Sequence, residues 1–147
     1  MSLLTIWADG LLASMELAAR RQLAGEMART LRASQAQRIR ANLQPDGSPM
    51  APRKPQPKLK KNRGRLRRKM FFKISNPAWL KARANEHQAV VEFVGTANRL
   101  ATIHQYGLKD RIKGREISYP ARELLGITEQ ERDQLETTLL AHLTKGL

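Results

Sequence analysis

The chain has 147 residues, a formal net charge of +14 and no cysteine. This length is typical of one ordinary domain, so we expect residues 1–147 to form a single domain. The absence of cysteine excludes disulfide bonds, thiolate metal sites and a cysteine nucleophile. No apolar stretch approaches the roughly 18–20 residues that cross a bilayer, so we expect no membrane partner.

The excess positive charge is concentrated in one segment. Between Asp46 and Glu86 the sequence holds 13 lysines and arginines and no acidic residue. Three interpretations are open: the segment contacts nucleic-acid phosphates without reading the bases, it docks on an acidic protein, or it is a solvated loop. Its densest part, which we call the basic arm, contains Lys58, Lys60, Lys61, Arg63, Arg65, Arg67, Arg68 and Lys69.

A long helix is predicted in the first third of the chain. From Ser14 onward, apolar residues recur at spacings of three and four, and Asn42 is the first stop signal. A helix this long cannot bury its whole length in one small core, so we expect part of its apolar stripe to face another subunit of a homo-oligomer. The stripe consists of Leu17, Leu23, Ala24, Met27, Leu31 and Ile39.

Prolines dominate the next stretch. Five of them between residues 44 and 65 remove backbone donors and disfavour helix, which predicts an extended, mobile basic loop. Asp46-Gly47 is a turn signal within it. Residues 66–74 then have the pattern of a short basic helix with Met70, Phe71 and Ile74 turned inward.

Short elements follow. Two stretches with strand character flank Asn85-Glu86-His87, which predicts an antiparallel hairpin. Gly107 is placed to close a short helix in the left-handed conformation. The predicted elements in order are a strand over Trp79–Ala84, a strand over Gln88–Val94, a helix over Asn98–Tyr106, a second basic loop over Lys109–Arg115, a short strand over Glu116–Tyr119 and a helical turn from Pro120 to Leu125.

A helix with a clear start signal ends the chain. Thr128 and Glu131 have the spacing of a capping box, and the stripe behind them is Leu135, Leu139, Leu140 and Leu143. The order of elements is a long N-terminal helix, a basic Pro-rich loop, a small antiparallel sheet with short helices, and a C-terminal helix. This order predicts an α+β fold.

The sequence contains no catalytic motif. The three histidines lie far apart, and no His-x-x-x-His or carboxylate–histidine spacing indicates a metal site. We therefore expect no enzymatic activity, no cofactor and no metal. His104 has the pattern of a packing and hydrogen-bonding residue, and Arg122 is interpreted either as an interface ion-pair partner or as an exposed arginine.

The landmarks, taken in order, resemble a known family. Gln37-Arg38-Ile39-Arg40 precedes Pro45-Asp46-Gly47 and the basic loop, and Arg67-Arg68-Lys69-Met70-Phe71 follows it. Ile103-His104-Gln105-Tyr106-Gly107-Leu108 and Tyr119-Pro120-Ala121-Arg122-Glu123-Leu124-Leu125-Gly126 come before the capped C-terminal helix. This succession resembles the phage virion morphogenesis proteins, the tail completion proteins of contractile-tailed phages of the P2 and Mu type. The motif or interface residues that the resemblance implies are His104, Tyr106, Gly107, Tyr119, Pro120 and Arg122.

The resemblance implies a structural protein that completes the tail or joins it to the head at the neck. It would form a ring, with six-fold symmetry favoured, around the DNA channel, and would reside in the virion after assembly in the host cytoplasm. Its implied partners are copies of itself, tail terminator or tube proteins, head-connector proteins and genomic DNA bound without sequence preference. The alternative is a sequence-nonspecific nucleic-acid-binding protein that acts outside the particle.

Overall fold

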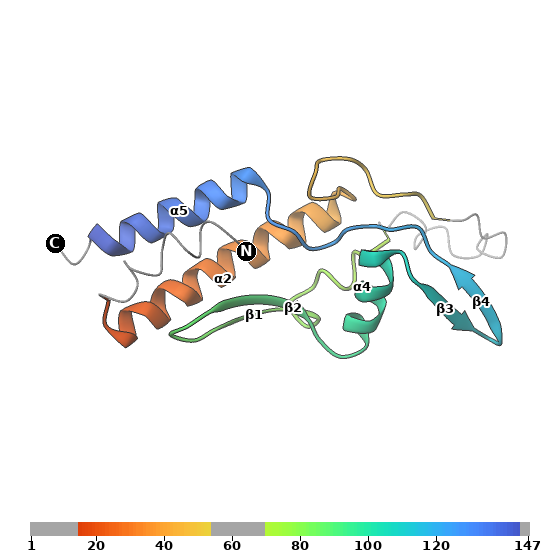
Figure 1. The fold of residues 1–147 in the computed structure, drawn as a ribbon, viewed down its shortest axis with the longest axis horizontal. Coiled ribbons are helices and arrows are strands. Elements are labelled where there is room, and N and C mark those ends of the chain that lie inside the picture. Colours follow the sequence, from red (N-terminus) through yellow and green to blue (C-terminus); the bar gives the residue numbers. More distant parts are fainter. Residues whose placement is uncertain (1–14, 54–69, 145–147) are drawn as a thin grey trace. The chain divides into compact units, whose positions relative to one another are not determined.

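Helices alternate with two-stranded sheets along the chain in a computed structural model, which describes residues 15–53 and 70–144 (Figure 1). The predicted α+β class is confirmed. The elements are α2 (Leu17–Arg40), β1 (Leu80–Ala84), β2 (Ala89–Phe93), α4 (Thr96–Tyr106), β3 (Lys109–Ile112), β4 (Arg115–Ser118) and α5 (Glu129–Thr144). All eight residues of the basic arm, and the predicted loop and helix from residue 54 to 69, lie outside the described residues.

The chain divides into two compact units. Unit 1 comprises Met1–Ala33, Lys81–Val91 and Ile127–Leu147, and unit 2 comprises Ser34–Leu80 and Glu92–Gly126. α2 runs through the boundary, so its first part belongs to unit 1 and its last turns to unit 2.

The core of unit 1 lies between two helices. Leu23 of α2 and Leu139 of α5 are buried against each other, and Met15, Met27 and Leu143 pack around them. Figure 1 shows α5 running alongside the first part of α2. The predicted stripes are therefore largely confirmed. Two of their members are exceptions, because Leu17 is 54% exposed and Leu140 is 48% exposed.

Both predicted ends of the long helices are confirmed in detail. Asn42 has a positive φ of 62°, the Asn42 amide donates to Ile39, and the Leu43 amide donates to Arg38. These two bonds form a Schellman motif, in which a left-handed residue satisfies the last carbonyls of a helix. At α5, the Thr128 amide donates to the Glu131 carboxylate at 3.0 Å and the Glu131 amide donates to the Thr128 hydroxyl at 3.1 Å. This is the predicted capping box.

The predicted hairpin of β1 and β2 is also present. The Asn85 amide donates to Gln88 at its turn, and the Val94 amide donates to Trp79 at its open end. The Asn85 side chain accepts bonds from the His87 and Gln88 amides, which fixes the turn.

Three short predictions were wrong. Residues 109–115, predicted as a loop, contain strand β3 and a two-residue turn to β4, because Lys113 and Gly114 both adopt the positive φ that a type I′ hairpin turn requires. Residues 120–125, where a helical turn was expected, have no regular secondary structure. The described end of the predicted basic helix, residues 70–74, forms turns, although Phe71 and Ile74 are buried as expected and Met70 is half-buried.

Candidate functional site: the His104–Arg122 cluster

Four of the motif residues come together in unit 2. α4 buries one face, which carries Ala97, Ala101 and His104 at helical spacing. Gly107 then ends α4 in the left-handed conformation, with φ 62° and ψ 49°. A Cβ at Gly107 would lie 2.9 Å from the Ala121 nitrogen, so only glycine lets the segment before Arg122 lie this close to the end of α4.

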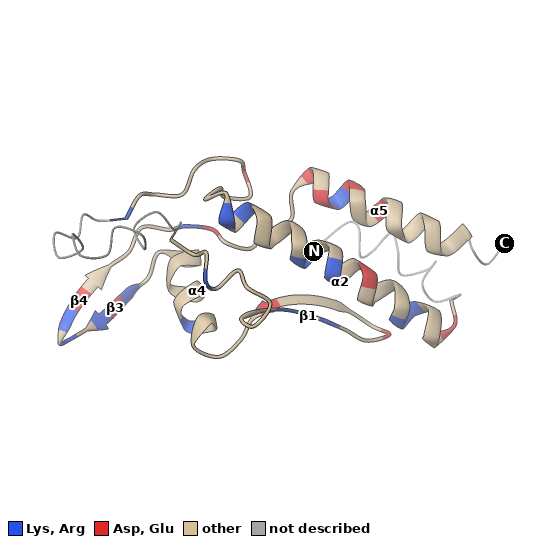
Figure 2. Cartoon of the chain, turned by 180° about the vertical axis from the view of Figure 1, so that it is seen from behind, with Lys and Arg blue, Asp and Glu red and all other residues tan. Residues whose placement is uncertain are grey.

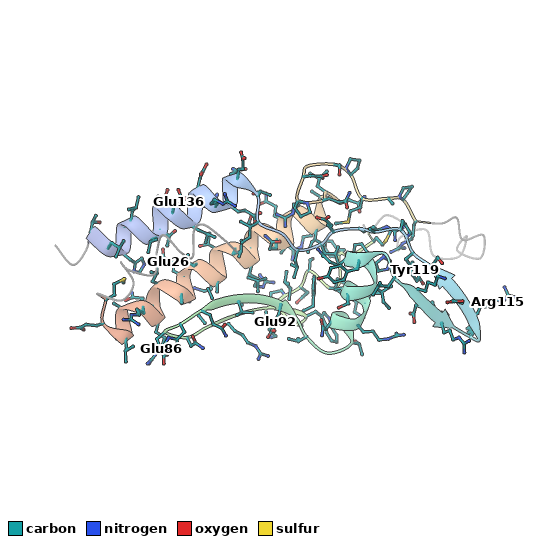
Figure 3. All side chains as sticks on the ribbon, viewed as in Figure 1. Glu26, Glu86, Glu92, Arg115, Tyr119 and Glu136 are labelled. Carbon is teal, nitrogen blue, oxygen red and sulfur yellow. The ribbon has the colours of Figure 1, made fainter. Side chains whose placement is uncertain are left out.

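His104 lies between two aromatic rings. Its ring meets Phe71 and Tyr119 edge-on, with centroids 4.8 Å apart in both pairs. Figure 3 shows Tyr119 at the base of the β3–β4 hairpin. The predicted packing role of His104 is confirmed, since only 5% of the residue is exposed.

The hydrogen bonds of His104 fix its protonation state. A guanidinium nitrogen of Arg122 lies 3.0 Å from Nδ1 of His104, and because a guanidinium only donates, Nδ1 must accept. The imidazole is therefore neutral, with its proton on Nε2. Burial, followed by the charge of Arg122, lowers the pKa of His104 to about 4. The Arg122 amide also donates to the His104 carbonyl at 2.6 Å.

Arg122 is a buried cation held by neutral acceptors. Its Nε donates to the Ala51 carbonyl at 2.7 Å, and its Nη2 donates to the Pro52 carbonyl at 2.9 Å. Burial lowers the pKa of Arg122, and the nearby Arg53 lowers it further. The exposed-arginine interpretation is wrong, because Arg122 is 3% exposed. Its guanidinium is occupied inside unit 2 by the two carbonyls and His104.

The cluster binds the chain on both sides of the segment that contains the basic arm. Ala51 and Pro52, which Arg122 holds, come just before residue 54, and Phe71, which packs on His104, comes just after residue 69. Arg53 also donates to the Met70 carbonyl at 3.3 Å. One buried cluster therefore fixes the points where the chain enters and leaves residues 54–69.

Glutamine side chains hold the segment that carries Arg122. Residues 119–126, which we call the strap, have no regular secondary structure, so their backbone groups need other partners. Gln105 accepts from the amides of Leu124 and Leu125 at 2.8 and 3.0 Å. The same side chain donates to the Leu125 carbonyl at 3.0 Å.

Two more glutamines extend this pattern. Gln35 accepts from the Gly126 amide at 3.1 Å and donates to the Gly126 carbonyl at 2.9 Å. Gln44 accepts from the Glu123 amide at 3.0 Å. Sequence reasoning missed all three glutamines, because no local pattern distinguishes a glutamine that binds distant backbone from one in solvent.

Sequence comparison identifies the family. The sequence profile of the phage virion morphogenesis family matches residues 2–144. The chain belongs to this family. It is 42% identical over 139 residues to tail completion protein S of Escherichia phage P2, and the match covers 92% of both chains. No solved structure matches the chain.

This member of the virion morphogenesis family therefore has a role in phage tail assembly. The cluster gives a physical account of part of the motif that carries the resemblance: His104, Gly107, Tyr119 and Arg122 contact one another or the strap. Tyr106 and Pro120 differ, because both are exposed, with Tyr106 at 71%.

Neither a metal-binding cluster nor a membrane-spanning helix occurs among the described residues. In residues 15–53 and 70–144, no group of three or more His, Cys, Asp or Glu side chains is arranged to hold a metal ion. Within the same ranges, no helix is both long and apolar enough to cross a membrane.

Proposed function

We propose that this chain completes the phage tail as a structural component, without catalysing a reaction. The observation that carries the proposal is its 42% identity to a tail completion protein over 92% of both chains. The site supports a structural role, because the buried polar groups of His104 and Arg122 are bonded to each other and to backbone carbonyls.

The experiment is deletion of the gene from the phage, followed by negative-stain microscopy of the lysate. Filled heads beside separate or abnormal tails, restored to whole particles when the protein is supplied, are the expected result. Normal infectious particles would contradict the proposal. A free nucleic-acid-binding protein would then be the better explanation of the charge of +14.

The finer part of the proposal is a ring around the DNA channel at the neck, where tail meets head. Six copies are the number that the family resemblance favours. Light scattering of the purified protein, and end-on class averages of tails that carry it, measure the number of copies. A protein that stays monomeric both alone and on tails would contradict the ring.

For the basic arm we propose a contact with DNA in that channel. The eight cations of the arm support this, because each can neutralise a DNA phosphate, and the cluster fixes the chain on both sides of residues 54–69. Neutralising Lys60, Lys61, Arg63 and Arg65 together is expected to leave rings and joined particles intact but to impair DNA retention or passage. Variants that fail to join particles at all would make the arm a protein contact instead.

A further inference from the structure

The β3–β4 hairpin of unit 2 is amphipathic. Its register pairs Lys109 with Ser118, Asp110 with Ile117, Arg111 with Glu116 and Ile112 with Arg115. Because side chains alternate across a strand, Lys109 and Arg111 lie on one face, and Asp110 and Ile112 lie on the other. The Tyr119 amide donates to the Leu108 carbonyl, which continues the ladder and places Leu108 on the face of Ile112.

The apolar face of this hairpin is incompletely covered. Leu108 and Ile112 are each 43% exposed, and Ile117 between them is half-buried. Among the described residues no third strand joins β3 and β4. A sheet with one apolar face is stable when that face packs against another element, and an isolated two-stranded sheet is marginal in water. The exposed apolar residues therefore indicate a surface that is completed by a partner.

The charges at and near the turn of the hairpin indicate the kind of partner. Asp110 pairs with Arg99 of α4, and Glu116 lies opposite Arg111, so both carboxylates of the hairpin have a cation beside them. Lys113 and Arg115 at the turn are exposed, and Figure 3 shows Arg115 pointing away from the ribbon at the end of the hairpin. Figure 2 shows the same basic end. Two cations thus adjoin the exposed Ile112.

We propose that this surface, formed by Leu108, Ile112, Ile117, Lys113 and Arg115, docks on an acidic protein surface of the phage tail. The partner would supply an apolar patch for Ile112 and Leu108, and carboxylates for Lys113 and Arg115. Arginine is enriched at protein–protein interfaces, and the fully buried core of an interface is more apolar than its rim. The inference rests on the proposed role in tail completion and adds the kind of partner.

Two other occupants fit the surface less well. Nucleic acid would contact Lys113 and Arg115 but would leave the exposed apolar side chains of Leu108 and Ile112 without a matching surface. A second copy of the chain related by a two-fold axis would bring Arg115 and Lys113 against their own equivalents. In a ring the contact would be head-to-tail, and a chain with a net charge of +14 is a poor source of the acidic surface that these cations need. An acidic protein surface avoids both conflicts.

The test uses tails purified from a lysate in which the gene is deleted. The full-length protein is added and its binding is measured by co-sedimentation. We expect wild-type protein to bind, and Ile112→Ser and the double variant Lys113→Glu with Arg115→Glu each to weaken binding by at least about tenfold, since anchor residues of an interface have effects of this size. Raised salt should weaken wild-type binding.

Matched controls come from unit 1. Ile127→Ser removes an apolar side chain of similar exposure, and Arg132→Glu reverses an exposed charge on α5. Both are expected to bind tails as wild type does. Because the substituted residues are exposed, urea unfolding should confirm that all four variants fold normally.

Several outcomes would overturn the inference. Wild-type protein that does not bind these tails, or hairpin variants that bind them undiminished, would do so. If the hairpin variants lose only binding to a short DNA duplex, the surface binds nucleic acid. If they lose only self-association, it binds a second copy of the chain. These results differ from failure of the proposed function, in which the deletion lysate contains normal particles.

Discussion

A guanidinium nitrogen of Arg122 donates to Nδ1 of His104 at 3.0 Å, and the backbone amide of Arg122 donates to the carbonyl of the same histidine at 2.6 Å. The two residues are thus joined twice, once through their side chains and once through their backbones. Because Arg122 also holds Ala51 and Pro52, and His104 also packs on Phe71, this pair connects the strap, α4 and both flanks of residues 54–69.

Replacing Arg122 by lysine should destabilise the protein although the charge is kept. A lysine ammonium cannot reach the Ala51 carbonyl, the Pro52 carbonyl and His104 together, so buried acceptors lose their donors. We expect the free energy of unfolding in urea to fall by about 3 kcal/mol. Arg132→Lys on the exposed surface of α5 is the control, with an expected change within about 0.5 kcal/mol. Equal effects of the two would show that the cluster contributes no stability.

His104 should make stability depend on pH. Its pKa is lowered from 6.5 to about 4 in the folded protein, so between these values the unfolded chain binds the additional proton. The stabilisation is therefore complete above pH 6.5 and is lost as the pH falls to about 4. Its size is up to about 3 kcal/mol, since one pKa unit corresponds to about 1.4 kcal/mol.

The measurement compares wild-type protein with His104→Asn across this pH range by urea unfolding. Asparagine does not titrate, so the difference between the two unfolding free energies should shrink as the pH falls. A difference that stays constant from neutral pH to about pH 4 would show that His104 is not the group responsible.

Elements with local signals were predictable from the sequence. The capping box of α5 needs only Thr128 and Glu131, and the end of α4 needs only Gly107, so each signal lies within a few residues of the element that it fixes. The turn between β3 and β4 was missed because Lys113 is an unusual residue at a positive φ, and Lys113-Gly114 gave no hairpin signal.

The strap and most of the cluster could not be predicted from the sequence, because their contacts join residues that lie far apart in the chain. The glutamine that holds Gly126 lies 91 residues earlier in the chain, and the carbonyl that accepts from Arg122 Nε lies 71 residues earlier. Such pairs are set by the tertiary fold. The histidine at 104 could be interpreted as a packing residue, but the sequence did not indicate that an arginine would be buried against it.

Removing the Gln105 side chain tests how the strap is held. Gln105→Ala would leave two amides and one carbonyl of Leu124 and Leu125 without their partner. We expect the free energy of unfolding to fall by about 2 kcal/mol, because unpaired backbone groups in a partly buried site are costly. Gln37→Ala, on an exposed position of α2, should change it by no more than about 0.5 kcal/mol. If Gln105→Ala lowers the free energy of unfolding no more than Gln37→Ala does, the hydrogen bonds of Gln105 do not hold the strap.

The capping box of α5 can be tested with a conservative pair. Thr128→Ala removes the hydroxyl that accepts from the Glu131 amide and should lower the free energy of unfolding by about 1 kcal/mol. Thr128→Ser keeps the hydroxyl and should recover most of that loss. Thr137→Ala, in the exposed middle of the same helix, controls for the general effect of replacing threonine. The cap is unimportant if Thr128→Ala and Thr137→Ala give the same unfolding midpoint.

Two glycines allow the cost of a left-handed backbone to be measured separately from the cost of close packing. Gly107 and Gly114 both have positive φ, 62° and 77°, but a Cβ at Gly107 would meet the Ala121 nitrogen at 2.9 Å, whereas nothing lies within 4 Å at Gly114. Alanine at Gly114 should therefore lower the free energy of unfolding by about 1–2 kcal/mol, which is the cost of the left-handed conformation for a residue with a Cβ. Alanine at Gly107 adds a clash with the backbone of the strap, which should raise the loss by about another 2 kcal/mol. Urea unfolding of both variants measures the difference, and equal losses would mean that the strap moves away from α4 without cost.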